Sequence, residues 1–597
     1  MRLISVRDLA CLAILVPLAP MLLFLSRPRP VISKDGIAYI TFARELFSKF
    51  SLHLPAWIHV DSGMILPPIF PFLVGMAEGL SPGSDGDTIL VAKWVCAICL
   101  SVASIPLYFL LSSYTNRVVS FLTIGGLHLN LEYFNMSRSA LTEASFILVV
   151  TVMLFALTRF SERFDPRLGI WLGLLCALTF LTRQIGLIAL PFCVGWLTLS
   201  GWAKGISQRE LIGMLTTVTV GFFIIFGSYA GLLYAQTGQH PFRQNFRWNH
   251  YAVSNHDPAV LEDIERIQAS PEGLYSQIYA KRRLMFQLLP DGAEMYDYLL
   301  EQDNDQTDFA AELESSAATI FRIAQDTASN LKGNLDHLKR NIGVFYYYAF
   351  LLATLSIFLP PSRNGSDWYP RTILAFAWMY LFSISLLGDL VARYVVVLVP
   401  FVILATAIEF FRVARKFTEY IWLPKLSSIA TLLTIMLIGM GTFSMPRVHS
   451  GHFPKDVKKL PPWPQLTFRK MLEPGSRVFT MHPLDSYLIG GTWMILPNDS
   501  LEKVVEYGRR THSRWLFVAR YDLRARDEKY YTETDWYRDR DLETHYPSLV
   551  KRCQLAETEH YRFDLYRIRP AASVESTGVD ECEPVIFQTG VYKSRPH

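Results

Sequence analysis

The sequence is poor in charged residues, and this scarcity excludes several classes of protein. Asp, Glu, Lys and Arg make up 18% of the 597 residues, whereas hydrophobic residues make up 51%. A typical soluble domain has more charge and less apolar sequence. The formal net charge is only +4, and no basic stripe is interleaved with aromatic residues, so no nucleic-acid partner is expected.

Cysteine patterns that hold a metal are also missing. None of the seven cysteines forms a CxxC pair or lies in a Cys/His cluster with zinc spacing, so no metal site is predicted. Cys553 and Cys582 lie in polar sequence, and whether they form a disulfide stays open. The other five lie in apolar segments, where cysteine behaves as a small core residue: Cys11, Cys96, Cys99, Cys176 and Cys193.

Long apolar runs are the dominant feature of the chain. A transmembrane helix needs roughly 20 mostly apolar residues, and the sequence predicts about eleven such spans. Their approximate ranges are 8–25, 88–113, 117–134, 140–158, 168–182, 185–200, 211–235, 342–360, 372–388, 391–411 and 426–444. Residues 64–80 are apolar but contain several prolines, and we interpret them as a re-entrant or interfacial element. The predicted fold class is an α-helical polytopic membrane protein.

The distribution of basic residues predicts which loops are cytoplasmic. With a cytoplasmic N-terminus and eleven spans, most Lys and Arg of the short loops fall inside. Arg183 divides the apolar run 168–200 into two short spans. A single kinked span there would reverse the orientation of everything downstream, but the charge pattern favours two. The run 8–25 is interpreted as a retained span, and a cleaved signal peptide is the alternative.

This topology divides the chain into two domains. Residues 1–444 form the membrane domain, with outer loops 26–87 and 236–341, and the second loop is expected to be mainly helical. Residues 445–597 form an extracytoplasmic α/β domain. In this tail "SRVFTM", "RWLFVARY" and "HYRFDLYRIR" are typical of strands, and "SLEKVVEYGRRT" is typical of a helix between the first two.

Several polar residues converge on the outer side of the predicted bilayer. Ionisable groups at membrane depth or at its edge are costly, so their positions are informative. Asp35 lies just beyond the first span, where helix capping is the alternative to a catalytic role. Glu143 also has a simple structural interpretation, as a negative charge that complements a helix N-terminus. The remaining members of the outer set are His59, Asp61, Arg138, Arg183, Asp389 and Arg393.

The three outer arginines are the most informative of these residues. Arginines at span ends often extend to phospholipid headgroups. Three of them in short outer loops nevertheless oppose the positive-inside bias. Binding of a phosphate explains them, because planar guanidinium groups hold phosphate oxygens through two parallel hydrogen bonds.

The chain resembles the GT-C membrane glycosyltransferases, especially bacterial relatives of the protein O-mannosyltransferases and of the lipid A aminoarabinose transferase. The resembling stretches run in family order over most of residues 30–410. They are "KDGIAYITFAREL", "PPIFPFLVGM", "SRSALTEASFILVV", "LTFLTRQIGLIALP" and "ARYVVVLVPFVIL". The soluble tail also fits this family.

This resemblance implies a function and a set of site residues. It implies a sugar donor on a polyprenyl phosphate, an extracytoplasmic acceptor, a bacterial plasma membrane location and Asp35 as the catalytic acid. Many relatives have a second acid directly after the first, whereas Gly36 follows here, so Glu143 is a candidate second acid. The predicted substrate-binding residues are Lys34, Tyr39, Asp61, Arg138, Glu143, Arg183 and Arg393.

The expected chemistry follows from these residue types. A carboxylate at residue 35 would act as general base on an acceptor hydroxyl, and outer arginines would stabilise the departing lipid phosphate. A divalent metal between acid and phosphate is compatible with this scheme, but no sequence feature requires a cofactor. The alternatives are a multi-span transporter, which would show internal repeats, and a catalytically inactive membrane scaffold.

Overall fold

The structure is a computed structural model, and it describes most of the helical segments and part of the tail. The described residues are 5–26, 67–79, 88–163, 166–237, 317–355, 368–386, 392–420, 426–444, 476–480, 491–496, 500–510, 513–520, 542–558 and 561–569, with a few single positions such as Tyr39. The chain divides into two compact units, 1–249 with 317–455 and 250–316 with 456–597.

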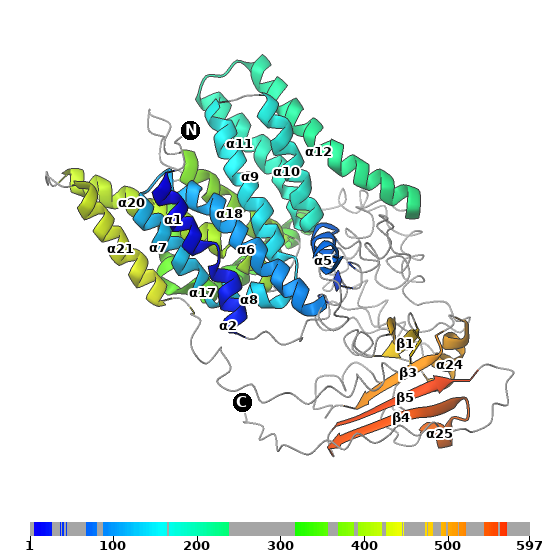
Figure 1. Cartoon of the computed structure of the whole chain (residues 1–597). Helices are drawn as coiled ribbons and strands as arrows, with labels where there is room; N and C mark the ends of the chain where they lie inside the picture. Colours follow the sequence, from blue (N-terminus) through cyan, green and yellow to red (C-terminus); the bar gives the residue numbers. More distant parts are fainter. Residues whose placement is uncertain are drawn as a thin grey trace. The chain divides into compact units, whose positions relative to one another are not determined.

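The described part of the first unit is helical (Figure 1). Its N-terminal helices are α1 (Val6–Leu15), α2 (Leu18–Leu25), α5 (Ile69–Gly79), α6 (Thr88–Ser112), α7 (Arg117–His128) and α8 (Leu131–Ser139). They are followed by α9 (Glu143–Arg163), α10 (Pro166–Thr182), the 3-10 helix η1 (Gln184–Ile188), α11 (Ala189–Ala203) and α12 (Gln208–Thr237). The last group is α17 (Ala317–Thr354), α18 (Trp368–Leu386), α19 (Ala392–Val396), α20 (Val399–Tyr420) and α21 (Leu426–Ser444).

Most predicted spans coincide with apolar helices. Among the described residues, six helices are long and apolar enough to cross a membrane, and four shorter apolar helices accompany them. The apolar run 168–200 is divided as expected, because α10 ends at Thr182 and α11 begins at Ala189. The proline-rich run 64–80 contains the short helix α5.

Three predicted spans are each divided into two helices, which the sequence analysis did not predict. The run 8–25 contains α1 and α2, separated by a turn at 16–17. The run 117–134 contains α7 and α8, because the Asn130 side chain accepts a hydrogen bond from the backbone N–H of Tyr133 (2.9 Å) and caps α8. The run 391–411 contains α19 and α20, separated by a turn at 397–398.

Helix α17 also differs from the expectation. It begins at Ala317, inside the segment predicted as an outer loop, and continues through the start of the predicted span 342–360. The two parts meet at Gly343, whose φ of 82° is a backbone conformation that favours glycine. The long outer loop therefore ends in a helix that is kinked into the next span.

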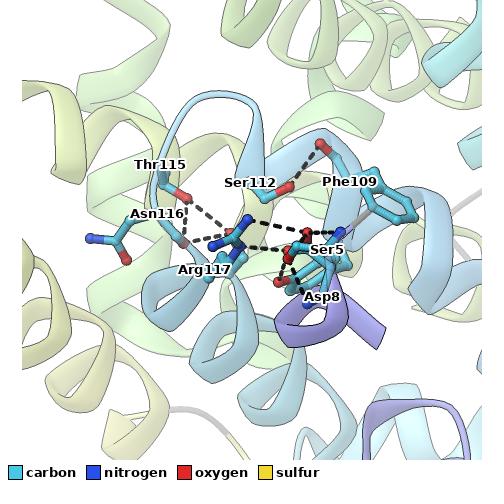
Figure 2. A network of polar contacts seen from close by, with 9 residues as sticks. Ser5, Asp8, Phe109, Ser112, Thr115, Asn116 and Arg117 are labelled. Atoms are coloured by element: carbon cyan, nitrogen blue, oxygen red, sulfur yellow. Dashed lines mark hydrogen bonds and ion pairs between the residues drawn. The ribbon is translucent and has the colours of Figure 1, made fainter. Parts of the chain in front are cut away.

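One carboxylate attaches the N-terminal helix to α6 and α7 (Figure 2). Ser5 and Asp8 form a capping box at the start of α1, in which each side chain accepts a backbone N–H of the other. The Asp8 carboxylate also accepts hydrogen bonds from the Tyr108 hydroxyl (3.0 Å) and from Nε of Arg117 (2.7 Å). These contacts join α1 to α6 and α7 through one carboxylate.

Helices α10 and α12 pack closely enough to fix the position of the turn that follows α10. A Cβ at Gly173 would lie 2.0 Å from the Val218 carbonyl oxygen, and one at Gly221 would lie 2.3 Å from the Ile170 carbonyl oxygen. Small residues allow such close backbone approach between membrane helices. This packing supports α10, whose last residue directly precedes Arg183.

The second unit contains a five-stranded sheet with strand order β2-β1-β3-β5-β4. The strands are β1 (Arg477–Thr480), β2 (Thr492–Ile495), β3 (Trp515–Arg520), β4 (Leu549–Thr558) and β5 (Tyr561–Ile568), with the helices α24 (Leu501–Arg510) and α25 (Leu542–His545). β1 pairs in parallel with β2 and β3, whereas β5 is antiparallel to β3 and β4. The three predicted strands and the predicted helix are present, and β2 and β4 were not predicted.

Candidate functional site

Arg183 lies at a sharp junction between two helices. The backbone N–H of Arg183 donates to the Thr179 carbonyl at the end of α10 (3.1 Å), and the Arg183 carbonyl accepts from the N–H of Gly186 in η1 (2.8 Å). A Cβ at Gly186 would lie 2.3 Å from the Thr179 oxygen, so glycine is needed for this tight turn. The turn presents the Arg183 side chain at the end of α10.

Glu143 is the first residue of α9 and follows a strained turn. Ala140 has a φ of 50°, the left-handed conformation that residues other than glycine rarely adopt. Such strain is typical of turns held in place by their surroundings. The Cys96 thiol donates to the Leu141 carbonyl (3.4 Å) and thereby attaches this turn to α6.

The structure brings Arg183 and Glu143 together. Nη1 of Arg183 lies 3.2 Å from Oε1 of Glu143, and both side chains are buried, with 10% and 5% of their surface exposed. The guanidinium also lies over the ring of Tyr394 in α19, 4.3 Å from the ring centroid. Three segments far apart in the sequence therefore meet at one arginine.

Burial explains why these groups associate. A buried charge without a partner is strongly unfavourable, whereas an oppositely charged neighbour offsets part of the desolvation cost. An aromatic face adds a favourable electrostatic contact with the cation. Oε2 of Glu143 has no hydrogen-bond partner among the described residues.

Two further cations lie on neighbouring elements. Arg138 is in the last turn of α8, with its guanidinium 5.6 Å from the ring centroid of Phe134. Lys93, in the second turn of α6, is buried and close enough to Arg138 for the two like charges to interact. The sequence analysis overlooked Lys93, although a single lysine inside an apolar run was a usable signal. It also overlooked Tyr394, which directly follows Arg393.

Other predicted site residues are described only in part or not at all. Asp35, Lys34 and Asp61 lie outside the described residues. Tyr39 is described, and its ring packs edge-on against Phe70 at 5.7 Å. Arg393 belongs to α19 by its backbone, and its side chain lies outside the described part.

The remaining predictions outside the described residues are His59, Asp389 and the bonding of Cys553 to Cys582. Within the described residues, no group of three or more His, Cys, Asp and Glu side chains is arranged to hold a metal ion. The part of the candidate site that the structure describes is centred on one buried arginine paired with a carboxylate.

One protein-family model matches part of the chain. The model described as dolichyl-phosphate-mannose-protein mannosyltransferase matches residues 66–229. ArnT from Cupriavidus metallidurans, solved bound to undecaprenyl phosphate, is similar with a TM-score of 0.50 and 10% identity, and the match covers 93% of this chain and 97% of ArnT. The chain has the GT-C fold.

Other comparisons are more distant. The oligosaccharyltransferase of Archaeoglobus fulgidus, solved with zinc and sulfate, has a TM-score of 0.48 and 11% identity, and the match covers 85% of this chain and 67% of that enzyme. The oligosaccharyltransferase AglB from Archaeoglobus fulgidus, solved with an inhibitory peptide and a dolichol phosphate, has a TM-score of 0.43 and 10% identity over 85% of this chain and 69% of that chain. No curated protein sequence matches the chain.

The GT-C fold confirms two predictions. The predicted fold class, a helical polytopic membrane protein with a sheet-containing C-terminal region, is correct. The predicted resemblance to the GT-C superfamily is also confirmed. The chain is an integral membrane protein. The roles of the individual site residues stay predictions.

Proposed function

We propose that the chain is a membrane glycosyltransferase that moves a sugar from a polyprenyl-phosphate donor to an extracytoplasmic acceptor. One observation carries this proposal. The family-model match to residues 66–229 contains the buried pair of Arg183 and Glu143 and, on neighbouring elements, Lys93 and Arg138, and such cations suit the phosphate of a lipid-linked sugar.

In the proposed reaction, Asp35 accepts a proton and the cations stabilise negative charge. Asp35 accepts the proton of an acceptor hydroxyl as the oxygen attacks the anomeric carbon of the sugar. The bond from the sugar to the phosphate oxygen breaks, and negative charge develops on the lipid phosphate. Arg183, with Arg138, Arg393 and Lys93 as further candidates, stabilises that charge. Because these groups are positioned before the reaction, they need little rearrangement in the transition state.

The proposed site suits both a lipid-linked donor and a water-borne acceptor. A polyprenyl chain requires an apolar environment between spans, whereas a water-borne acceptor approaches from the aqueous side. In the sequence Asp35 lies ten positions after the end of the first predicted span, and Glu143 and Arg183 lie at helix ends. A lipid headgroup and an aqueous acceptor meet at such a boundary.

The proposal is tested with purified protein and a panel of polyprenyl-phosphate sugars that includes hexose and pentose donors. We expect at least one donor to lose its sugar in the presence of a cell-envelope extract, with release of polyprenyl phosphate measured by mass spectrometry. Absence of release with every donor, from protein that is folded and monodisperse in detergent, would exclude this function.

We further propose that the chain lies in a bacterial plasma membrane with its N-terminus cytoplasmic and its tail outside, because the basic residues follow this orientation. A reporter that is active only outside the cytoplasm, fused after residue 450, is expected to be active. A cytoplasmic reporter at the same position serves as the control. Activity of the cytoplasmic reporter alone would mean that the number of spans is wrong by one.

A further inference from the structure

The inference concerns the two residues that contact Arg183. The guanidinium carbon of Arg183 lies over the Tyr394 ring, 4.3 Å from its centroid, and Nη1 lies 3.2 Å from the Glu143 carboxylate. A guanidinium held by contacts with two different side chains has little freedom to rotate. The arrangement therefore fixes the direction of the guanidinium as well as its position.

The supporting residues come from different parts of the fold. Glu143 begins α9 after the strained turn at Ala140, Arg183 lies between α10 and η1, and Tyr394 is in α19 next to Arg393. The contacts therefore join three chain segments around one side chain. They also place Arg183 beside the short helix that carries Arg393.

An ion pair that only stabilised the fold would not require a carboxylate with one unpartnered oxygen. The Glu143 carboxylate uses one oxygen for Arg183, while Oε2 has no hydrogen-bond partner among the described residues. Pairing that served stability alone would favour engagement of both oxygens, since a buried polar atom without a partner is costly. The retained cost fits a site in which orientation of the cation matters more than stability.

We propose that Tyr394 and Glu143 are positioning residues that hold Arg183 in the orientation needed to bind the donor phosphate in the transition state. This inference rests on the proposed function. The contact with Tyr394 restrains the guanidinium, and its in-plane N–H groups are the ones that donate to phosphate oxygens. Glu143 sets the rotation of that plane through its charge.

The role of Tyr394 is tested by comparing Tyr394→Leu, which removes the ring, with Tyr394→Phe, which keeps it. We expect Tyr394→Leu to lower kcat about tenfold with little change in the KM for the acceptor, because one desolvated cation–π contact is lost. Tyr394→Phe should recover most of this loss. The matched control is Tyr348→Leu, since Tyr348 is exposed and contacts the ammonium of Lys339 outside the candidate site.

A double-mutant cycle separates positioning from general packing. If Tyr394 acts through Arg183, Tyr394→Leu should change the rate by less than about twofold when Arg183→Lys is already present. The reason is that the effects of substituting two residues in contact are not additive. Equal fold losses in both backgrounds would overturn the inference. So would a normal rate for Tyr394→Leu in otherwise active protein.

The role of Glu143 is tested by Glu143→Gln, which keeps the shape and removes the charge. We expect kcat to fall about tenfold or more, because Arg183 loses the partner that fixes its orientation. Glu409→Gln is the matched control, since Glu409 is a buried carboxylate paired with Arg412 at 2.8 Å in α20. Both variants should lower thermal stability in detergent, but only Glu143→Gln should lower kcat.

The outcomes distinguish this inference from the function on which it rests. If the unaltered chain transfers no sugar from any donor, the proposed function fails. If the unaltered chain is active and Glu143→Gln loses no more activity than Glu409→Gln, the function stands and the positioning role of Glu143 is wrong.

Discussion

Asp35→Asn is expected to abolish measurable sugar transfer while the amount of folded protein in the membrane stays normal. Asn has nearly the same shape as Asp but cannot take the proton from the acceptor hydroxyl. Loss of a general base typically lowers a rate by about 10²–10⁴-fold. The measurement is the release of polyprenyl phosphate by purified variant and unaltered protein, with thermal stability in detergent recorded for both.

The same substitution separates catalysis from helix capping. Asn is as good a helix cap as Asp, so a capping role predicts a variant with normal activity and normal stability. Asp35→Ala completes the comparison, because loss of a cap costs about 0.5–2 kcal/mol of stability. Normal transfer by Asp35→Asn would remove this residue from the mechanism.

The helical fold was predictable because the signal for membrane spans is local. Each apolar run carries its own free energy of transfer into hydrocarbon, so α6, α9, α12 and α21 appear close to the predicted bounds. The breaks were harder to predict. The division at Asn130 depends on a side chain that caps α8, and the kink at Gly343 depends on one glycine in an otherwise helical sequence.

The candidate site was predictable only as a set of residues on one side of the membrane. Polar residues at span ends identified Glu143 and Arg183 separately. Their contact joins positions 40 residues apart in the sequence, and no local pattern specifies it. Tyr394 and Lys93 were overlooked for a related reason, because a single tyrosine or lysine near a span end is usually an interfacial residue.

The structure bears on the two interpretations of Glu143 that the sequence allowed. The sequence suggested either a second acid or a charge at a helix N-terminus. The carboxylate does begin α9, where the helix dipole favours it. It also lies against a buried guanidinium, a contact that fits the proposed positioning of Arg183. An interaction of Oε2 with substrate remains compatible with this arrangement.

Arg183→Lys and Arg393→Lys are expected to lower turnover more than they lower donor affinity. Lys keeps the positive charge but loses the planar fork that donates two parallel hydrogen bonds to a phosphate. The phosphate gains charge as the glycosidic bond breaks, so the contact is stronger in the transition state than with bound donor. For Arg183 we expect kcat to fall on the order of 10²-fold, similar to removal of one preorganised donor at a developing anion.

The competing role for these arginines is anchoring to lipid headgroups, and Lys extends to headgroups equally well. The structure favours binding for Arg183, because its side chain is only 10% exposed and contacts Glu143 and Tyr394. Arg412→Lys is the matched control, since Arg412 also pairs with a buried glutamate and should keep normal turnover. Donor binding and initial rates are measured for all three variants. If Arg183→Lys and Arg393→Lys both bind donor and transfer sugar at normal rates, the donor phosphate must be held by other groups, such as Lys34, Lys93 or a metal ion.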